Sequence, residues 1–201
     1  SFKINNKIPN NIIAVTGTNG KSSIADFYYQ ILDLNNKKVA SIGTLGIKSK
    51  KYKKDLSNTT IDPIQLSKIL NKLKKQNINN VIMEASSHGL SQNRLDGLLF
   101  NTGIFTNLSQ DHLDYHKNTK NYLKAKLYLF EKLIKKRGNI ITDEKIPEFK
   151  KIKNIATNKN LNLFSLLDKK NNFQFLSHQY EGESQLLEIK YKNSIHKIKL
   201  N

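Results

Sequence analysis

The sequence predicts an α/β fold in which helices flank a mostly parallel sheet, with a small antiparallel β region at the C-terminal end. Short β-branched apolar runs alternate with stretches whose apolar residues recur at helical spacing, which is typical of βαβ units. A glycine-rich turn separates the first apolar run from the first helical stretch. The chain has 201 residues, 37% of them hydrophobic, so it can bury a core and wholesale disorder is excluded.

Five apolar runs are expected to form the parallel strands, because each is short, rich in β-branched residues and bounded by polar or glycine positions. In chain order they are residues 11–16, 39–43, 81–84, 103–106 and 139–142. The carboxyl ends of parallel strands meet at one edge of a sheet, where ligands bind. We therefore expect Thr16, Glu84 and Thr106 to lie at the same edge.

Three helices are expected between these strands, over residues 22–34, 62–76 and 118–136. The second has the clearest start, with Asp62 as N-cap, proline at the first helical position and Gln65 completing a capping box. The polar stretch 48–60 before it is expected to be a loop.

The sequence pattern changes after about residue 160, where short apolar or alternating segments are separated by Asn, Gly and Ser. These segments are Leu161–Leu167, Phe173–Ser177, Ser184–Tyr191 and Ile195–Leu200. They predict antiparallel hairpins at the sheet edge. We interpret 1–201 as one domain in which 160–201 is a β-rich subregion.

The composition excludes several classes of protein. Without cysteine there is no disulfide scaffold, thiolate nucleophile or sulfur-based zinc site, which favours a cytoplasmic enzyme. No apolar run is long enough to cross a membrane, and no signal peptide opens the chain. The chain starts at Ser1 and its single methionine is Met83, so we expect a piece of a longer protein.

The net charge of +18 raises the possibility of a nucleic-acid partner. Only two of the 34 basic residues are arginines, Arg94 and Arg137, and the lysines are scattered among Asn and Ile. This pattern indicates solvated surfaces, so no nucleic-acid partner is expected. A basic nucleic-acid-binding module with an NTPase loop remains the alternative from another class, and salt-sensitive affinity for DNA or RNA would favour it.

The strongest local signal is Thr16-Gly-Thr-Asn-Gly-Lys-Ser-Ser23, between a predicted strand and a predicted helix. Main-chain N–H groups of such a turn surround phosphate oxygens at a helix N-terminus. Lys21 would reach the β- and γ-phosphates of ATP, and the Ser22 hydroxyl would bind Mg²⁺. The fold expected is therefore like that of P-loop NTPases, although Val15 stands where their general pattern has glycine.

Four segments together resemble the central domain of the Mur ligases. Gly17-Thr-Asn-Gly-Lys-Ser-Ser23 resembles the loop G-T-[NK]-G-K-[ST]-[ST] that these enzymes share with the folylpolyglutamate synthetases. The other three are Asn58-Thr-Thr-Ile-Asp-Pro63, Glu84-Ala-Ser-Ser-His-Gly-Leu90 with Gln92-Asn-Arg94, and Thr106-Asn-Leu-Ser-Gln-Asp-His-Leu-Asp-Tyr-His116. The resemblance covers roughly residues 11–145. It departs from the family at Ser22-Ser23, where Thr-Thr is commoner, and at Ile61, where proline is usual.

The resemblance implies an ATP-dependent ligase of peptidoglycan precursor synthesis. It would add a diamino acid to UDP-N-acetylmuramoyl-L-alanyl-D-glutamate through an acyl phosphate, with ATP and Mg²⁺, as a monomer in the cytoplasm. The N-terminal UDP-binding and C-terminal amino-acid-binding domains of the family are absent from this chain, so alone it should not form the amide bond. A folylpolyglutamate synthetase-like ligase is the alternative within the class.

The resemblance also implies a role for individual residues. The ATP-binding residues would be Gly17, Thr18, Asn19, Gly20, Lys21, Ser22 and Ser23. The metal ligands would be Ser22, Glu84 and His112, and Asp111 would support His112. The catalytic residues would be Lys21, His112 and Lys126. Lys126 would be carboxylated by CO₂ to N6-carboxylysine. The substrate-binding residues would be Asn58, Thr59, Thr60, Ser86, Gln92 and Arg94, where only the Arg94 guanidinium offers a bidentate fork to a carboxylate.

Overall fold

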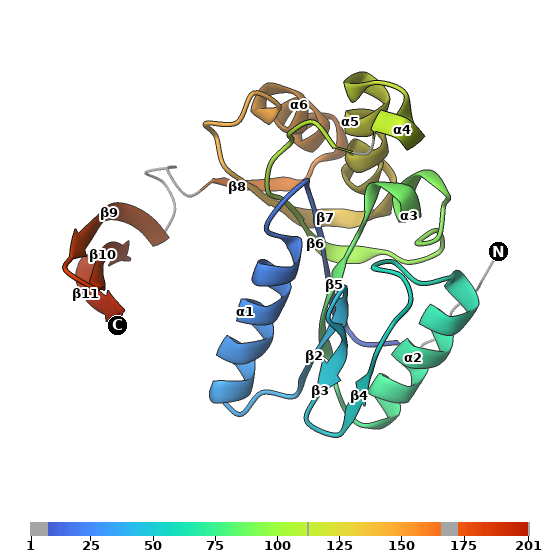
Figure 1. The fold of residues 1–201 in the computed structure, drawn as a ribbon, viewed down its shortest axis with the longest axis horizontal. Coiled ribbons are helices and arrows are strands. Elements are labelled where there is room, and N and C mark those ends of the chain that lie inside the picture. Colours follow the sequence, from blue (N-terminus) through green and yellow to red (C-terminus); the bar gives the residue numbers. More distant parts are fainter. Residues whose placement is uncertain (1–7, 112, 166–172, 201) are drawn as a thin grey trace.

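The computed structural model describes residues 8–111, 113–165 and 173–200. Most of them form an α/β domain around an eight-stranded sheet (Figure 1). In their side-by-side order its strands are β4 (Tyr52–Lys54), β3 (Gly46–Ser49), β2 (Val39–Gly43), β5 (Asn80–Glu84), β1 (Asn11–Thr16), β6 (Phe100–Phe105), β7 (Ile134–Thr142) and β8 (Asn162–Ser165). The helices are α1 (Lys21–Leu34), α2 (Pro63–Lys75), α3 (Ser87–Ser91), α4 (Leu113–His116), α5 (Thr119–Tyr128) and α6 (Phe149–Lys159), with a π-helical turn η1 (Leu129–Leu133).

The predicted parallel sheet is confirmed. Strands β2, β5, β1, β6, β7 and β8 run parallel, while β3 pairs antiparallel with β2 and β4 with β3. Thr16 and Glu84 end β1 and β5, and Thr106 directly follows β6. The Thr106 N–H donates to the Thr16 carbonyl at 3.0 Å, so the ladder continues to this point. All three residues therefore lie at the carboxyl edge of the sheet, as expected.

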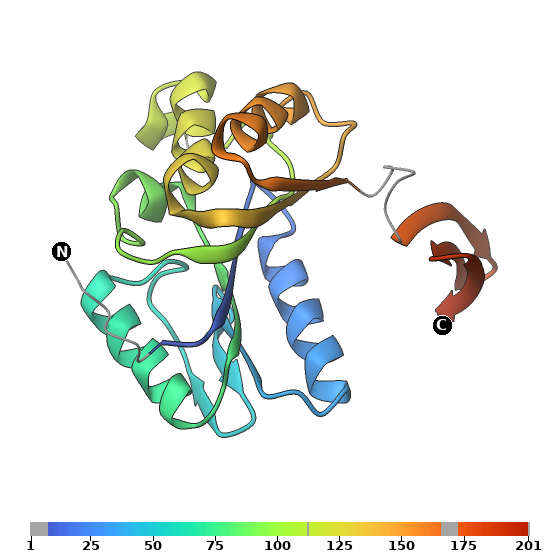
Figure 2. The same cartoon turned by 180° about the vertical axis from the view of Figure 1, so that it is seen from behind.

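Helices cover both faces of the sheet, and Figures 1 and 2 show α1 on one side of the strands with α2 on the other. The smaller apolar cluster joins Ile13, Val15 and Ile82 to Ala25 of α1. The larger cluster lies on the opposite face and takes its helical members from α2, α3, α5, η1 and α6. Because alternate residues of a buried strand face opposite ways, β1 supplies both clusters and is buried on both sides.

The start of α2 follows the predicted cap. Asp62 is the N-cap, and one oxygen of its carboxylate accepts the N–H groups of Ile64 and Gln65, both at 3.0 Å. Pro63 is the first residue of the helix, a position whose N–H has no partner within the helix, so the lack of an N–H in proline costs no hydrogen bond. The cap fixes where the chain turns from the segment containing residues 58–60 into the helix.

The expectation of a loop over residues 48–60 is wrong for its first part. Residues 46–49 and 52–54 form the hairpin β3–β4, closed by the Ser49 hydroxyl, which donates to the Tyr52 carbonyl and accepts from the Tyr52 N–H, both at 3.0 Å. Several residues of this hairpin are lysines, so a search for apolar patterns does not detect it. They are compatible with it because β4 is the edge strand, and exposed lysines protect an edge from pairing with other chains.

The expected helix over residues 118–136 ends early. Helix α5 ends at Tyr128, η1 covers 129–133, and Ile134 already belongs to β7. Ile134 pairs with Phe100 of β6, so pairing in the sheet overrides a local pattern that would also suit a helix. Helix α6 was not expected, although Phe149, Ile152 and Ala156 have helical spacing among the lysines.

The C-terminal β region differs from the expectation in two respects: its first segment belongs to the main sheet, and its other strands form a separate sheet instead of hairpins at the edge of the main one. Its first segment forms β8, which pairs parallel with β7 in the main sheet, and residues 166–172 lie outside the described residues. The remaining strands, β9 (Phe173–Glu181), β10 (Ser184–Tyr191) and β11 (Ser194–Leu200), form a separate antiparallel sheet with β10 in the middle. Among the described residues no helix is long and apolar enough to cross a membrane.

Candidate active site

The phosphate loop joins β1 to α1 and requires glycine at its first position. Gly17 has a φ of 148°, and a Cβ atom there would overlap the side chain of Thr106. Gly20, with a φ of 83°, is the N-cap of α1, which begins at Lys21. The main-chain N–H groups of the loop therefore lie at a helix N-terminus, where the helix dipole favours an anion.

The segment that follows β6 holds this loop in place. Asn107 accepts the Thr18 N–H with its carbonyl at 2.9 Å and the Asn19 N–H with its side-chain oxygen at 3.0 Å. The Thr106 hydroxyl in turn donates to the Asn19 carbonyl at 2.7 Å. Two of the segments singled out in the sequence are thus joined by hydrogen bonds, which restrict the loop before any ligand binds.

A pocket of about 310 Å³ lies beside the loop at the carboxyl edge of the sheet. It is lined by residues 18–23 of the loop and by Thr44, Thr59, Glu84, Ser86, Ser87, Tyr122 and Lys126. Hydroxyl groups, two lysines and one carboxylate thus meet in one place. This combination suits a ligand that carries phosphate together with a divalent cation.

Lys21 folds back over the loop. Its ammonium group donates to the carbonyls of Gly17 at 3.1 Å and Thr18 at 2.8 Å. Burial lowers the pKa of Lys21, and the carboxylates of Glu84 and Asp111 partly oppose this shift. The charge lies where it could exchange two carbonyl contacts for stronger ones to phosphate oxygens.

Lys126 is the most deeply buried lysine that the structure describes, with 1% of its surface exposed. Its amine donates to the Gly17 carbonyl at 2.7 Å and lies 4.2 Å from the centre of the Tyr122 ring. Burial and, to a lesser degree, the charge of the nearby Lys21 lower the pKa of Lys126 to about 7, and Asp111 partly opposes this shift. A substantial fraction of the Lys126 amines is therefore neutral at pH 7, whereas an ordinary lysine is neutral only about once in a few thousand.

Glu84 ends β5 with its side chain 2% exposed. Its two carboxylate oxygens accept the N–H of Thr44 at 2.8 Å and the hydroxyl of Thr44 at 3.1 Å. The end of β2 leaves room for this carboxylate, because a Cβ atom on Gly43 would overlap it. The sheet thus presents a buried anion to the pocket, opposite the cationic loop.

The donors around the pocket fit a magnesium ion. The Ser22 hydroxyl and the Glu84 carboxylate both line it, and Mg²⁺ takes oxygen ligands while keeping several waters. In the part of the chain that the structure describes, no three His, Cys, Asp or Glu side chains cluster as a metal site. These two residues would therefore share the ion with waters and phosphate oxygens. The expected ligand His112 lies outside the described residues.

The expected substrate-binding residues occupy two places. Thr59 and Ser86 line the pocket, whereas Asn58 is exposed, with a single side-chain bond to Ser57 at 3.4 Å among the described contacts. The buried Thr60 hydroxyl donates to the Glu84 carbonyl at 3.1 Å. It accepts the N–H and the hydroxyl of Ser86 at 2.9 and 3.0 Å, so it braces the segment against the end of β5.

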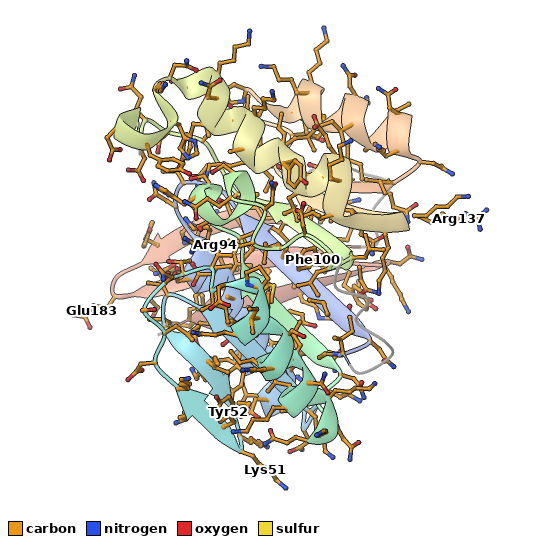
Figure 3. All side chains as sticks on the ribbon, turned by 90° about the vertical axis from the view of Figure 1, so that its right-hand side faces the viewer. Lys51, Tyr52, Arg94, Phe100, Arg137 and Glu183 are labelled. Carbon is orange, nitrogen blue, oxygen red and sulfur yellow. The ribbon has the colours of Figure 1, made fainter. Side chains whose placement is uncertain are left out.

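Arg94 is held beside this segment. Its Nη1 donates to the Thr60 carbonyl at 2.7 Å and its Nε to the side-chain oxygen of Gln92 at 2.8 Å. The Gln92 amide donates to the Tyr115 hydroxyl at 3.1 Å. Figure 3 shows Arg94 toward the middle of the molecule, whereas Arg137 projects from its periphery. The two arginines of the chain thus differ, and only Arg94 is fixed near the pocket.

Four residues of the site were missed at the level of sequence: Thr44, Ser87, Asn107 and Tyr122. The Tyr122 hydroxyl bonds the Thr18 hydroxyl at 3.2 Å, which links α5 to the phosphate loop. Asn107 and Tyr122 lie within or just beyond segments that were recognised, so their motifs could have marked them. Thr44 follows a predicted strand directly, and only its place at the carboxyl end could have drawn attention to it.

Comparison with known proteins identifies the family. The family described as the Mur ligase middle domain matches residues 15–201. The chain therefore belongs to this family.

Two similar relatives and one similar solved structure carry the same name. The chain is 46% identical over 155 residues to UDP-N-acetylmuramoyl-L-alanyl-D-glutamate–2,6-diaminopimelate ligase of Wigglesworthia glossinidia brevipalpis, covering 75% of this chain and 31% of the relative. It is 36% identical over 187 residues to the enzyme of that name from Zymomonas mobilis, covering 93% and 38%. A solved structure of a ligase with this name superposes with a TM-score of 0.79 at 28% identity, covering 94% of this chain and 39% of the other. The chain thus spans about a third of these relatives' length.

Proposed function

We propose that this chain is the ATP-binding part of a ligase that adds 2,6-diaminopimelate to UDP-N-acetylmuramoyl-L-alanyl-D-glutamate. The observation that carries the proposal is one pocket in which a phosphate loop, Lys126 and Glu84 meet. The names of the relatives support the choice of substrates. We place the reaction in the cytoplasm, where ATP is available, and propose a monomer.

In the proposed reaction the γ-phosphate of ATP passes to the D-glutamyl carboxylate. The amine of the diamino acid then attacks the acyl phosphate, and the tetrahedral intermediate collapses with loss of phosphate. ATP and the D-glutamyl carboxylate are both anions, so the main contribution of the protein to the first step is positioning and charge neutralisation. The loop N–H groups and Lys21 would hold the phosphates, and bound Mg²⁺ would add positive charge beside them. No nucleophilic side chain is required.

Lys126 would act as a carbamate. Its neutral amine would attack the carbon of CO₂, forming a C–N bond and releasing a proton to solvent, which turns a cation into an anionic oxygen ligand. The pKa of about 7 supports this proposal, because only the neutral amine has a free electron pair for the attack. The N–H that the carbamate keeps could retain the 2.7 Å contact with the Gly17 carbonyl, which would place the carbamate oxygens next to the loop.

Arg94 would bind a carboxylate of the muramoyl dipeptide. Two of its nitrogens are fixed by Thr60 and Gln92, which leaves the remaining N–H groups for a ligand. Thr59 and Ser86 would contact the substrate inside the pocket. Asn58 and Gln92 would do so at its rim, and Thr60 would contribute by holding the segment in place.

The experiment is a domain replacement. A chimera in which this chain replaces the middle domain of the Wigglesworthia relative is mixed with ATP, Mg²⁺, UDP-N-acetylmuramoyl-L-alanyl-D-glutamate and either diaminopimelate or lysine. We expect ADP and the diaminopimelate product from the chimera, no product from its Lys21→Ala variant, and no product from the 201-residue chain alone. A folded chimera that binds neither ATP nor the dipeptide would contradict the proposal, and turnover by the chain alone would contradict its domain organisation.

A further inference from the structure

Within the described part of the chain, a single neighbour donates the hydrogen bonds that the Glu84 carboxylate accepts. Among the described residues, both donors to its side-chain oxygens come from Thr44, one from the main chain and one from the hydroxyl. A buried carboxylate is costly unless its oxygens are bonded, and bonds to a charged group are among the stronger ones. Thr44 therefore provides a hydrogen bond to each oxygen of this side chain and fixes the orientation of its plane.

The preceding residue shows that the end of β2 is shaped around this carboxylate. A Cβ atom on Gly43 would overlap the Glu84 side chain from Cγ to Oε1. Gly43 is the last residue of β2, and Thr44 follows it at the exposed rim of the pocket. One residue thus provides space for the carboxylate and the next provides its donors.

The direction of the hydrogen bonds follows from the chemistry of the groups. The Thr44 hydroxyl lies 3.1 Å from a Glu84 oxygen and 3.0 Å from the Thr59 hydroxyl oxygen. A carboxylate only accepts, and a hydroxyl has one proton, so Thr44 donates to Glu84. Thr59 must then donate to Thr44. The chain of bonds runs from Thr59 through Thr44 to Glu84, and it leaves the Thr59 oxygen as an acceptor.

We propose that Thr44 is a positioning residue for the metal site and couples it to the substrate side of the pocket. It holds the Glu84 carboxylate in one orientation, with the remaining lone pairs of both oxygens available to a divalent cation. It also orients the Thr59 hydroxyl, whose proton points to Thr44. Thr59 can therefore only accept a hydrogen bond from a ligand, and the ligand group must be an N–H or O–H donor. The metal role of Glu84 rests on the proposed function, whereas the contacts of Thr44 do not.

The test measures metal affinity directly, with Mn²⁺ as the probe. Binding of Mn²⁺ to the 201-residue chain saturated with ATP is followed by electron paramagnetic resonance for the wild type, Thr44→Val and Thr44→Ser. Loss of a residue that hydrogen-bonds a metal-binding side chain typically weakens metal affinity by tenfold or more. We therefore expect about tenfold weaker Mn²⁺ binding in Thr44→Val. Thr44→Ser, which keeps the hydroxyl, should bind within about twofold of the wild type.

Thr157→Val is the matched control. The Thr157 hydroxyl donates to the Lys153 carbonyl within α6, at 3.1 Å, on an exposed helix surface. We expect its Mn²⁺ affinity to equal that of the wild type. Thermal unfolding shows whether each variant is folded at the temperature of the binding assay. Weaker Mn²⁺ binding by a folded Thr44→Val chain then reports the local change at the carboxylate.

A second measurement needs no substitution. The amide resonance of Thr44 in the ¹⁵N-labelled wild type is followed during titration with Mg²⁺ in the presence of ATP. Its N–H donates to Glu84, so it should shift with the same saturation curve as the metal binding. The role of Thr44 would be overturned if the wild type and a folded Thr44→Val variant bound Mn²⁺ equally well, or if Mg²⁺ did not shift the Thr44 resonance. Either result would leave the proposed function standing. A wild-type chain that binds no metal with ATP would overturn the proposed function as well.

Discussion

The amine of Lys126 lies 2.7 Å from the main-chain carbonyl oxygen of Gly17, although 109 positions separate the two residues in the chain. This contact joins α5 to the first residue of the phosphate loop. It places a lysine whose pKa is about 7 beside the binding site for a polyphosphate. A ligand in the loop and the charge on Lys126 must therefore influence each other.

Lys21 should dominate the affinity for Mg·ATP. Replacing it with alanine removes a charge-assisted contact to phosphate, and we expect at least tenfold weaker binding in isothermal calorimetry. Lys53→Ala, on the exposed edge strand β4, is the control and should bind as the wild type does. Equal affinities of the Lys21→Ala and Lys53→Ala variants would show that the pocket is not the nucleotide site.

Gly17 should be intolerant of any side chain. In Gly17→Ala the new methyl group meets Thr106, and the backbone must also hold a φ of 148°. We expect ATP binding to be lost. Gly182→Ala is the control, because its φ of 60° is also positive but a Cβ atom there has no neighbour within 4 Å among the described residues. If both variants bind ATP equally, the overlap with Thr106 does not constrain the loop.

Lys126 should react with CO₂ near neutral pH. In solutions containing ¹³C-bicarbonate at pH 7.5, we expect one protein carbamate signal by ¹³C NMR, absent from Lys126→Ala. The signal should decrease below pH 7, because protonation removes the electron pair that attacks CO₂. A carbamate signal of the same size in Lys126→Ala would assign the reaction to another amine.

Burial of Lys126 should also make stability depend on pH. Its pKa is about 7 in the folded chain and 10.5 for a lysine exposed to water, as in the unfolded chain, so between these values the unfolded chain binds more protons. Stability therefore rises with pH across this range. In CO₂-free buffer, Lys126→Met should be more stable than the wild type near pH 6.5, and by pH 9.5 this advantage should shrink by up to about 3 kcal/mol. A difference in urea unfolding free energy that stays constant with pH would contradict the shifted pKa.

The sequence by itself determined the parallel strands, the phosphate loop and the start of α2. Each depends on signals within a few residues: β-branched runs, a glycine turn between strand and helix, and Asp62 followed by proline. Once the strands were known to be parallel, their shared carboxyl edge followed from connectivity, which is why Thr16, Glu84 and Thr106 were placed correctly.

Only the tertiary structure decided the end of α5, the β3–β4 hairpin and the character of the site. Ile134 suits a helix or a strand, and its pairing with Phe100 settles the choice. Lys126 has no local signal among so many lysines, because its pKa is set by burial and by Lys21, which lies far away in the chain. The same holds for Thr44, whose importance comes from the Glu84 carboxylate that β5 brings beside it. Local sequence sets backbone preference, whereas solvation and charge arise only when distant segments meet.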